Sequence, residues 1–208
     1  MLSGQHGGVE DVPATAMQQD EQRIAQLQDL GEGRMRFSRI QGGSSDSRNT
    51  HQSHYYELGF ERMLNGSRDP VVVDPFARNC SWGTLTNDID PETNASNHMD
   101  ALCWLESLDR QSADFVLFDP PFSKRQADEK YAGHVNVYTD PGYVKKCFKE
   151  IASILKPGGK VLKLGYNSSK HSKILELEEG WIVNFGGNRN DVVMTIWRKA
   201  QTTLGDWA

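Results

Sequence analysis

Short apolar runs alternate with helical patterns along most of the 208-residue chain. Four of these runs predict strands, at residues 71–73, 84–88, 115–118 and 160–165. Apolar residues at helical spacing predict three helices, at residues 54–64, 101–108 and 142–155. The apolar runs 181–185 and 192–197 flank a polar turn and predict a closing hairpin. Strands that alternate with helices favour an α/β fold with a mostly parallel sheet, to which the hairpin adds an antiparallel strand.

The amino-terminal part of the chain has a different composition. Residues 1–49 are rich in Gln, Gly, Ser and charge, contain Phe37 as their single aromatic residue, and predict a flexible arm. A helical pattern at residues 20–30 lies within this arm. The rest of the chain predicts one domain, residues 50–200, followed by a short tail, residues 201–208.

Composition and charge narrow the function classes. The chain contains no apolar stretch that could span a membrane and no signal-peptide pattern, so we expect a cytoplasmic protein without a membrane partner. Cys80, Cys103 and Cys147 have neither disulfide nor metal spacing, so no metal is expected. The net charge is −5, yet residues 121–175 hold 11 Lys and Arg against 4 Asp and Glu. This basic segment fits either an approaching phosphate backbone or an ordinary solvated surface.

The most informative residues are Asp119-Pro120-Pro121-Phe122, directly after the apolar run 115–118. Prolines cannot donate to a strand ladder, so the run predicts a buried strand that ends in a rigid turn. Ligands bind at the carboxyl ends of strands in open α/β sheets. A carboxylate and a carbonyl there can accept both N–H bonds of an exocyclic amino group, while the ring stacks on the base. The alternative is a turn whose aspartate only caps the backbone.

This tetrapeptide, with the strand before it, resembles motif IV of the amino-methyltransferases, which use S-adenosylmethionine to methylate adenine N6, cytosine N4 or guanine N2. The resemblance covers about residues 53–199. It implies the class I methyltransferase fold, which is Rossmann-like, with S-adenosylmethionine as the cofactor. It also implies that Asp119, Pro120, Pro121 and Phe122 hold the target base during direct in-line methyl transfer, and that Asp119 borders the cofactor.

The segment Asp74-Pro75-Phe76-Ala77 is similar to motif I of the same family, usually Asp-Pro-Phe-x-Gly-x-Gly. The resemblance implies that Asp74, Pro75, Phe76 and Ala77 bind the methionine part of the cofactor. The chain departs from the pattern beyond Ala77, because no glycine appears before Gly83.

Two later positions match further cofactor motifs of the family. Asp88, with Asp90 as its reserve, matches the acid that accepts the ribose hydroxyls, and Asp100-Ala101 resembles the segment that meets the cofactor adenine. Asp100 is also suited to cap the following helix. Asp88 follows Asp74 too closely for a normal crossover, so either the first helix is reduced to a turn or one of the strands is misplaced.

Residues beyond the predicted turn carry groups suited to nucleic acid. Lys124, Arg125 and Lys130 could grip phosphates and Tyr131 could stack on a base, although an exposed loop explains them equally well. Tyr143 and residues 166–169 also follow predicted strand or turn ends, where they could line the target pocket.

The leading hypothesis is a small adenine-N6 DNA methyltransferase. The chain has no obvious target-recognition domain, so loops, the arm, a partner chain or a second copy of the chain would supply specificity. The resemblance extends to phage-type enzymes, which would act in the host cytoplasm. One alternative is an RNA methyltransferase acting on adenine N6 or guanine N2 of ribosomal or transfer RNA. The other is a degenerate methyltransferase fold that serves as a nucleic-acid-binding or assembly subunit.

Overall fold

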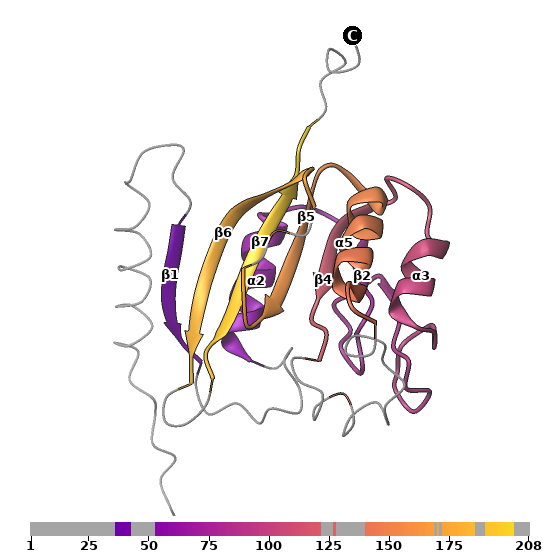
Figure 1. Ribbon diagram of the computed structural model, residues 1–208, viewed down its shortest axis with the longest axis horizontal. Coiled ribbons are helices and arrows are strands. Elements are labelled where there is room, and N and C mark those ends of the chain that lie inside the picture. The colour runs from indigo at the N-terminus through magenta and orange to yellow at the C-terminus, as the bar shows by residue number, and fades with distance from the viewer. Residues whose placement is uncertain are drawn as a thin grey trace, which may run out of the picture. The chain divides into compact units, whose positions relative to one another are not determined.

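The computed structural model of the chain describes residues 36–42, 53–121, 127, 140–168, 170, 172–185 and 190–201. These residues form a seven-stranded sheet in the order β1-β6-β7-β5-β4-β2-β3 (Figure 1). The strands are β1 (Arg36–Gln41), β2 (Val72–Asp74), β3 (Leu85–Thr86), β4 (Ala113–Phe118), β5 (Leu155–Gly165), β6 (Leu175–Asn184) and β7 (Val192–Lys199). The helices are α2 (His54–Leu64), α3 (Ala101–Ser107) and α5 (Tyr143–Ile154).

The sheet is parallel except at β7. This strand runs antiparallel to both of its neighbours, β5 and β6, whereas all other paired strands are parallel. The predicted α/β fold with a closing hairpin is therefore confirmed. The hairpin's first strand begins earlier than expected, at Leu175, because three glutamates between residues 175 and 180 obscure the inward-facing Leu175 and Leu177.

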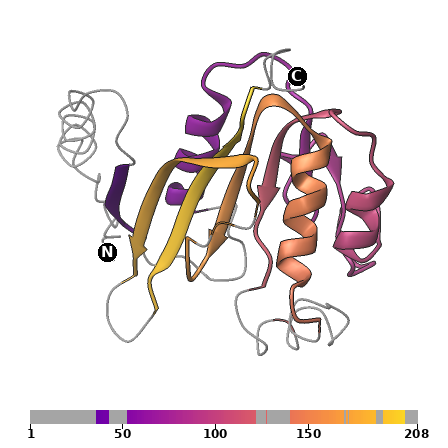
Figure 2. The same ribbon diagram turned by 45° about the horizontal axis from the view of Figure 1, so that its top comes forward.

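Helices cover both faces of the sheet (Figure 2). Helix α2 directs Tyr55, Tyr56 and Met63 into one apolar core. Helices α3 and α5 pack on the other face and share a second core with residues of β4 and β5. The central strands are buried from both sides, which is why they are continuous apolar runs in the sequence. None of the described helices is long and apolar enough to cross a membrane.

Strand β1 extends the sheet at its edge. It pairs in parallel with β6, and the Gly42 amide continues the ladder by donating to the Asn184 carbonyl at 2.8 Å. Phe37 lies over Gly180, where a Cβ atom would come within 2.7 Å of the Phe37 ring. These residues belong to the predicted flexible arm, and their sequence predicts no strand, because Phe37 and Ile40 lack the spacing of an alternating strand.

The connection from β2 to β3 resolves the alternatives left by the sequence. Both strands are present and pair in parallel, with Asp74 opposite Thr86. Residues 75–84, all of them described, form turns and bends and no helix. The first crossover helix is therefore reduced to a turn. A single parallel bridge between Asn87 and Asn97 stands beyond β3.

Gly59 sets how closely α2 approaches the sheet. A Cβ atom there would come within 2.6 Å of the Met194 sulfur and 3.0 Å of a Leu162 methyl carbon. We expect Gly59→Ala to lower the free energy of unfolding by about 1–3 kcal/mol, because crowding outweighs the better helix propensity of alanine. Urea denaturation measures this, with Glu57→Ala at an exposed position of α2 as the control. A stabilised Gly59→Ala protein would contradict the close approach.

Candidate active site

The strand order reverses between β2 and β4. The chain passes outward from β2 to β3 on one side of this point and from β4 to β5 on the other. Ligands of open α/β sheets bind at the carboxyl ends of strands beside such a reversal. Asp74 is the last residue of β2 and Asp119 follows β4, and Val73 pairs with Val116 between these two strands. The two carboxylates therefore stand at the same edge of the sheet.

The turn after β4 joins a half-buried carboxylate to a rigid support. Phe118 is fully buried, Asp119 is partly exposed, and Pro120 and Pro121 are buried. The predicted stacking residue, Phe122, lies outside the described residues. Burial between a central strand and two prolines fixes the backbone on both sides of Asp119, so this carboxylate is presented at a defined position.

Groups from several elements surround Asp119. Burial raises the pKa values of Asp74, Tyr56 and Cys80, and the negative charge of Asp119 adds to each shift. The pKa of Tyr55 rises to about 12 through burial, again with a contribution from Asp119. Helix α2 thus contributes two tyrosines to the neighbourhood of the carboxylate. The sequence does not predict this proximity, because no local pattern links residues 55 and 56 to residue 119.

Asp74 is an almost fully buried acid, with only 4 % of its surface exposed. Its Oδ1 atom accepts a hydrogen bond from the Phe76 amide at 3.1 Å. Burial, with smaller contributions from Asp119 and Asp88, raises its pKa to about 8, although the Phe76 N–H acts in the opposite direction. The carboxyl group is therefore protonated at neutral pH, and a cation bound beside it would favour the ionised form.

The loop after Asp74 keeps a glycine-like backbone without the expected glycines. Arg78 occupies the first glycine position of the motif I pattern and adopts a left-handed φ of 47°. The Ala77 amide donates to the Asn87 carbonyl at 2.9 Å, so Ala77 is tied to the end of β3. Gly83 is needed at the end of the loop, because a Cβ atom there would lie 3.0 Å from the Asp74 Cβ and 2.9 Å from a Thr86 methyl carbon.

Trp82 anchors this loop to α2. Its ring stacks on Tyr56 at a centroid distance of 5.4 Å and on Phe60 at 4.7 Å. Tyr56 and Phe60 are four residues apart, so they share one face of the helix. The sequence offered only this i, i+4 aromatic pair as a signal. The aromatic contact holds in place a loop that the family pattern would build from glycines.

The sequence predicts Asp88 as the last residue of a strand, whereas β3 ends at Thr86 and Asp88 lies two residues beyond it, with its carboxylate turned into the protein. The residue has no exposed surface, and its two oxygens accept hydrogen bonds from the Arg78 and Asp90 amides, each at 3.0 Å. Burial raises its pKa, with Asp90 adding to the shift, while these amides and Arg78 lower it. Asp90, the reserve candidate, is partly exposed and lies 3.9 Å from the Arg78 guanidinium.

Asp100 caps α3, as expected, and also meets a buried tyrosine. One carboxylate oxygen accepts hydrogen bonds from the Leu102 and Cys103 amides, at 2.9 and 3.3 Å. The other accepts the Tyr143 hydroxyl at 3.0 Å. Tyr143 is therefore a buried partner of Asp100 rather than an open wall of a target pocket.

A small hollow brings the predicted cofactor segments together. It is lined by Pro75, Phe76, Ile89, Asp100, Ala101 and Tyr143. Its cavity volume is about 10 Å³, room for about one water molecule, so a larger ligand would have to displace side chains. Phe76 also packs edge-on against Phe118 at 5.5 Å, which connects the hollow to the strand that carries Asp119.

A buried side-chain amide that no sequence pattern predicts joins these loops. Asn87 has no exposed surface, and its side-chain nitrogen donates to the Pro75 and Met99 carbonyls, at 3.3 and 3.0 Å. Its side-chain oxygen accepts the Met99 amide at 3.0 Å. Asn87 thus fixes the segments before Asp100 and after Asp74 relative to each other.

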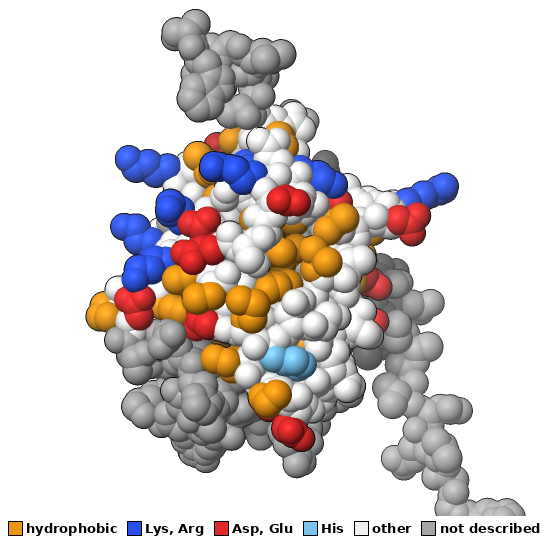
Figure 3. Space-filling model, turned by 90° about the vertical axis from the view of Figure 1, so that its right-hand side faces the viewer, with side chains coloured by type: hydrophobic (Ala, Val, Ile, Leu, Met, Phe, Trp, Pro, Cys, Tyr) orange, Lys and Arg blue, Asp and Glu red, His pale blue; other side chains and the backbone are white. Residues whose placement is uncertain are grey.

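The predicted nucleic-acid contacts Lys124, Arg125, Lys130 and Tyr131 lie outside the described residues. Of the described lysines in the basic segment, four form ion pairs: Lys146, Lys149, Lys156 and Lys160. On the face in Figure 3, the described Lys and Arg side chains lie toward the top, away from the carboxyl ends of the parallel strands, which point down in Figure 1. This distribution favours the solvated-surface interpretation for the described lysines. The described residues contain no cluster of potential metal ligands.

The raised pKa of Asp74 predicts a pH-dependent stability. Unfolded Asp74 ionises near its ordinary value of 3.8, whereas folded Asp74 keeps its proton up to about pH 8. Stability is therefore lost as the pH rises between these values, by up to about 1.4 kcal/mol per pH unit. Asp74→Asn keeps an acceptor for Phe76 but removes this loss, so its stability relative to wild type should grow from pH 5 to pH 8. Urea denaturation across this range decides, and parallel profiles would show that Asp74 ionises normally.

The left-handed backbone at Arg78 predicts a difference between two substitutions. Arg78→Gly and Arg78→Ala both remove the ion pair with Asp90. Only glycine adopts the φ of 47° without steric cost, so we expect Arg78→Gly to be more stable than Arg78→Ala by about 1 kcal/mol. Thermal and urea denaturation of both variants measure this difference. Equal stabilities would show that the loop changes its conformation once Arg78 is replaced.

Comparison with known proteins identifies the architecture. No protein-family profile and no curated protein sequence match the chain. The proposed methyltransferase YhhF from Escherichia coli superimposes with a TM-score of 0.50 at 12 % identity, covering 71 % of this chain and 85 % of its own. TrmN from Thermus thermophilus gives 0.48 at 14 % identity, over 71 % of this chain and 49 % of its own.

The N-methyltransferase NodS from Bradyrhizobium japonicum WM9, in complex with S-adenosyl-L-homocysteine, gives a TM-score of 0.45 at 9 % identity, over 70 % of this chain and 85 % of its own. Identities this low establish the fold alone. The match to YhhF, together with the parallel sheet and its antiparallel β7, shows that the chain has the Rossmann-like fold of that methyltransferase.

Proposed function

We propose that the chain is an S-adenosylmethionine-dependent methyltransferase that modifies the exocyclic amino group of a nucleobase, with adenine N6 of DNA as its substrate. The observation that carries this proposal is the position of Asp119. It is a partly exposed carboxylate between a buried central strand and two buried prolines, beside the reversal of strand order. A plain structural turn has no need of such an acceptor at the ligand-binding edge of the sheet.

The chemistry of the neighbouring residues fits the cofactor. Asp74 and Asp119 stand where a ligand with a sulfonium and an ammonium group would be stabilised, and the proton held by Asp74 can be exchanged for such a cation. The hollow offers apolar walls from Phe76 and Ile89 and the carboxylate of Asp100, a combination suited to an aromatic ring with an amino group. These residues would hold the adenosine part, after side chains move to admit it.

The chain's own task in the reaction is to accept and orient the amino group. S-adenosylmethionine, when bound, supplies the electrophilic methyl group, so no protein nucleophile is required. The Asp119 carboxylate and the Pro120 carbonyl would each accept one N–H of the amino group, which directs the nitrogen lone pair toward the methyl donor. Phe122 would stack on the base. A base in a duplex must first be flipped out of the helix.

The burial of Asp88 beside the proposed cofactor loop favours one competing function. Asp88 is fully buried and bound to the Arg78 and Asp90 amides, so it presents no surface to a ribose. A methyltransferase fold kept as a binding or assembly subunit would tolerate this arrangement. Calorimetric titration with S-adenosylmethionine separates the two functions. Micromolar one-site binding would support the enzyme. No binding up to millimolar ligand, with or without nucleic acid, would support the binding or assembly subunit.

Removal of the Asp119 carboxylate tests the catalytic assignment. We expect Asp119→Ala to reduce methyl transfer at least a hundredfold, because the amino group loses an oriented acceptor, while the Kd for S-adenosylmethionine changes only a few-fold. Transfer of labelled methyl groups to DNA and to RNA, followed by digestion to nucleosides, measures the rate and identifies the base.

Asp109→Asn is the matched control, since Asp109 is an exposed carboxylate that precedes β4 rather than following it. Loss of cofactor affinity in Asp119→Ala equal to its loss of transfer would assign Asp119 to the cofactor instead. Methylation of RNA alone would assign the RNA substrate class.

A further inference from the structure

Tyr166 stands on the opposite side of Asp119 from the proposed cofactor residues. Across the sheet, the carboxyl ends follow the order β3, β2, β4, β5, which places Asp88, Asp74, Asp119 and Tyr166 in sequence along one edge. Phe118 pairs with Lys163 in the parallel ladder of β4 and β5. Neighbouring strands lie about 4.8 Å apart and rise about 3.3 Å per residue, so the Cα atoms of Tyr166 and Asp119 are about 8 Å apart if the strand direction continues.

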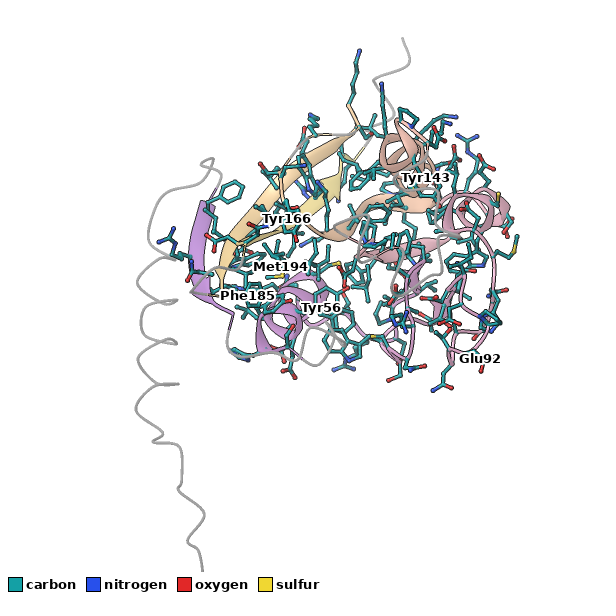
Figure 4. All side chains as sticks on the ribbon, turned by 60° about the horizontal axis from the view of Figure 1, so that its bottom comes forward. Tyr56, Glu92, Tyr143, Tyr166, Phe185 and Met194 are labelled. Atoms are coloured by element: carbon teal, nitrogen blue, oxygen red, sulfur yellow. The ribbon has the colours of Figure 1, made fainter. Side chains whose placement is uncertain are left out.

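The ring of Tyr166 is exposed, unlike the other described tyrosines. It is 49 % exposed, whereas Tyr55, Tyr56 and Tyr143 are buried. Figure 4 shows Tyr56 and Tyr143 on the two sides of the sheet, where they belong to the two apolar cores. Tyr166 belongs to neither core, and about half of its surface is exposed to solvent beyond the carboxyl end of β5.

A buried lysine holds the backbone next to this ring. The Lys163 ammonium donates to the Asn167 main-chain carbonyl at 3.0 Å and to the Asn167 side-chain oxygen at 3.3 Å. The lysine is only 4 % exposed, and burial lowers its pKa to about 8. A desolvated ammonium with two acceptors on one residue favours a single position of that residue, and hence of Tyr166 immediately before it.

Aromatic contacts connect Lys163 and Asn167 to β4, the strand that precedes Asp119. The Lys163 ammonium lies 6.0 Å from the centroid of Phe148, which packs edge-on against Phe118 at 5.1 Å. Phe118 in turn contacts Phe76 of the proposed cofactor loop. The position of Asn167 is thus connected through packed rings to the residue that precedes Asp119.

From this geometry we infer that Tyr166 is a stacking surface for the unpaired nucleobase whose amino group reaches Asp119, and that Lys163 positions it through Asn167. The inference rests on the proposed function and extends it by naming the wall of the target-base site. A planar base between Asp119 and β5 would present its face to an exposed ring, and base–aromatic stacking tolerates any base. The cofactor would occupy the β2 and β3 side of Asp119 and the nucleobase the β5 side.

Substitution of Tyr166 tests the stacking contact. We expect Tyr166→Ala to raise the KM for the nucleic acid about ten- to a hundredfold, the range of one base–aromatic stack, with an unchanged Kd for S-adenosylmethionine. Tyr166→Phe keeps the ring and should recover most of this affinity. Ile174→Ala is the matched control, because Ile174 is also 49 % exposed but its carbonyl accepts the Ala200 amide at the opposite edge. An unchanged KM in Tyr166→Ala would overturn the inference.

The role of Lys163 is tested separately. Lys163→Met keeps the length of the side chain but removes the donors to Asn167, so the KM for nucleic acid should rise. The melting temperature should not fall, since an apolar group replaces a desolvated cation. Lys160→Met, in the middle of the same strand, should leave the KM unchanged. A lower melting temperature with an unchanged KM for Lys163→Met would make Lys163 purely structural and overturn its positioning role.

A readout without methyl transfer separates this inference from the proposed function. A single-stranded oligonucleotide that contains 2-aminopurine reports stacking through its fluorescence. Wild type and Tyr166→Phe should change the emission on binding by similar amounts, and Tyr166→Ala should change it clearly less, because only the proposed Phe122 stack would remain. If wild type methylates neither DNA nor RNA, the proposed function fails, but this pattern would still support Tyr166 as a base-binding surface. The same emission change in Tyr166→Ala would overturn it.

Discussion

The rest of the site depends on a surplus of carboxylates at one edge of the sheet. Three neighbouring strands end at or shortly before an aspartate: Asp74, Asp88 and Asp119. Among the described residues, the Phe76 amide donates to Asp74, and the Arg78 and Asp90 amides donate to Asp88. Burial of Asp74 beside these charges raises its pKa to about 8. The proton stabilises buried Asp74, and a bound cation beside it would favour the ionised form instead.

The loop above these acids achieves close packing by other means than a glycine-rich sequence. Arg78 bears the left-handed backbone that glycine usually provides, and Trp82 stacks on Tyr56 and Phe60 of α2. The aromatic contact offsets the strain of a bulky residue at positive φ. The same arrangement leaves Asp88 enclosed, because its oxygens serve the loop backbone. A ribose could reach this acid only if the loop moved, which links cofactor entry to the Trp82 contact.

Sequence patterns predicted the elements whose signal is local. The runs ending at Asp74 and Asp119 are buried on both faces, so they appear as apolar segments, and Asp100 caps α3 as its position suggests. Strand β1 was missed because Phe37 and Ile40 do not alternate. Lys163 and Asn87 were missed for another reason, since both are polar residues whose burial depends on partners that folding brings together. The contact of Trp82 with α2 likewise has no counterpart within either segment.

The order of groups along the sheet edge explains how a small chain could bind two ligands. The strand reversal places the proposed cofactor residues on β2 and β3 and leaves β4 in the middle, so that Asp119 has a neighbour on each side. On the cofactor side the walls are Phe76 and the hollow beside Asp100. On the other side β5 extends beyond the end of β4 and carries Tyr166 past Asp119. In the proposed reaction the amino nitrogen would meet the methyl group in line while Asp119 accepts one of its N–H bonds, and β5, which extends beyond β4, would form the wall on the side of the base.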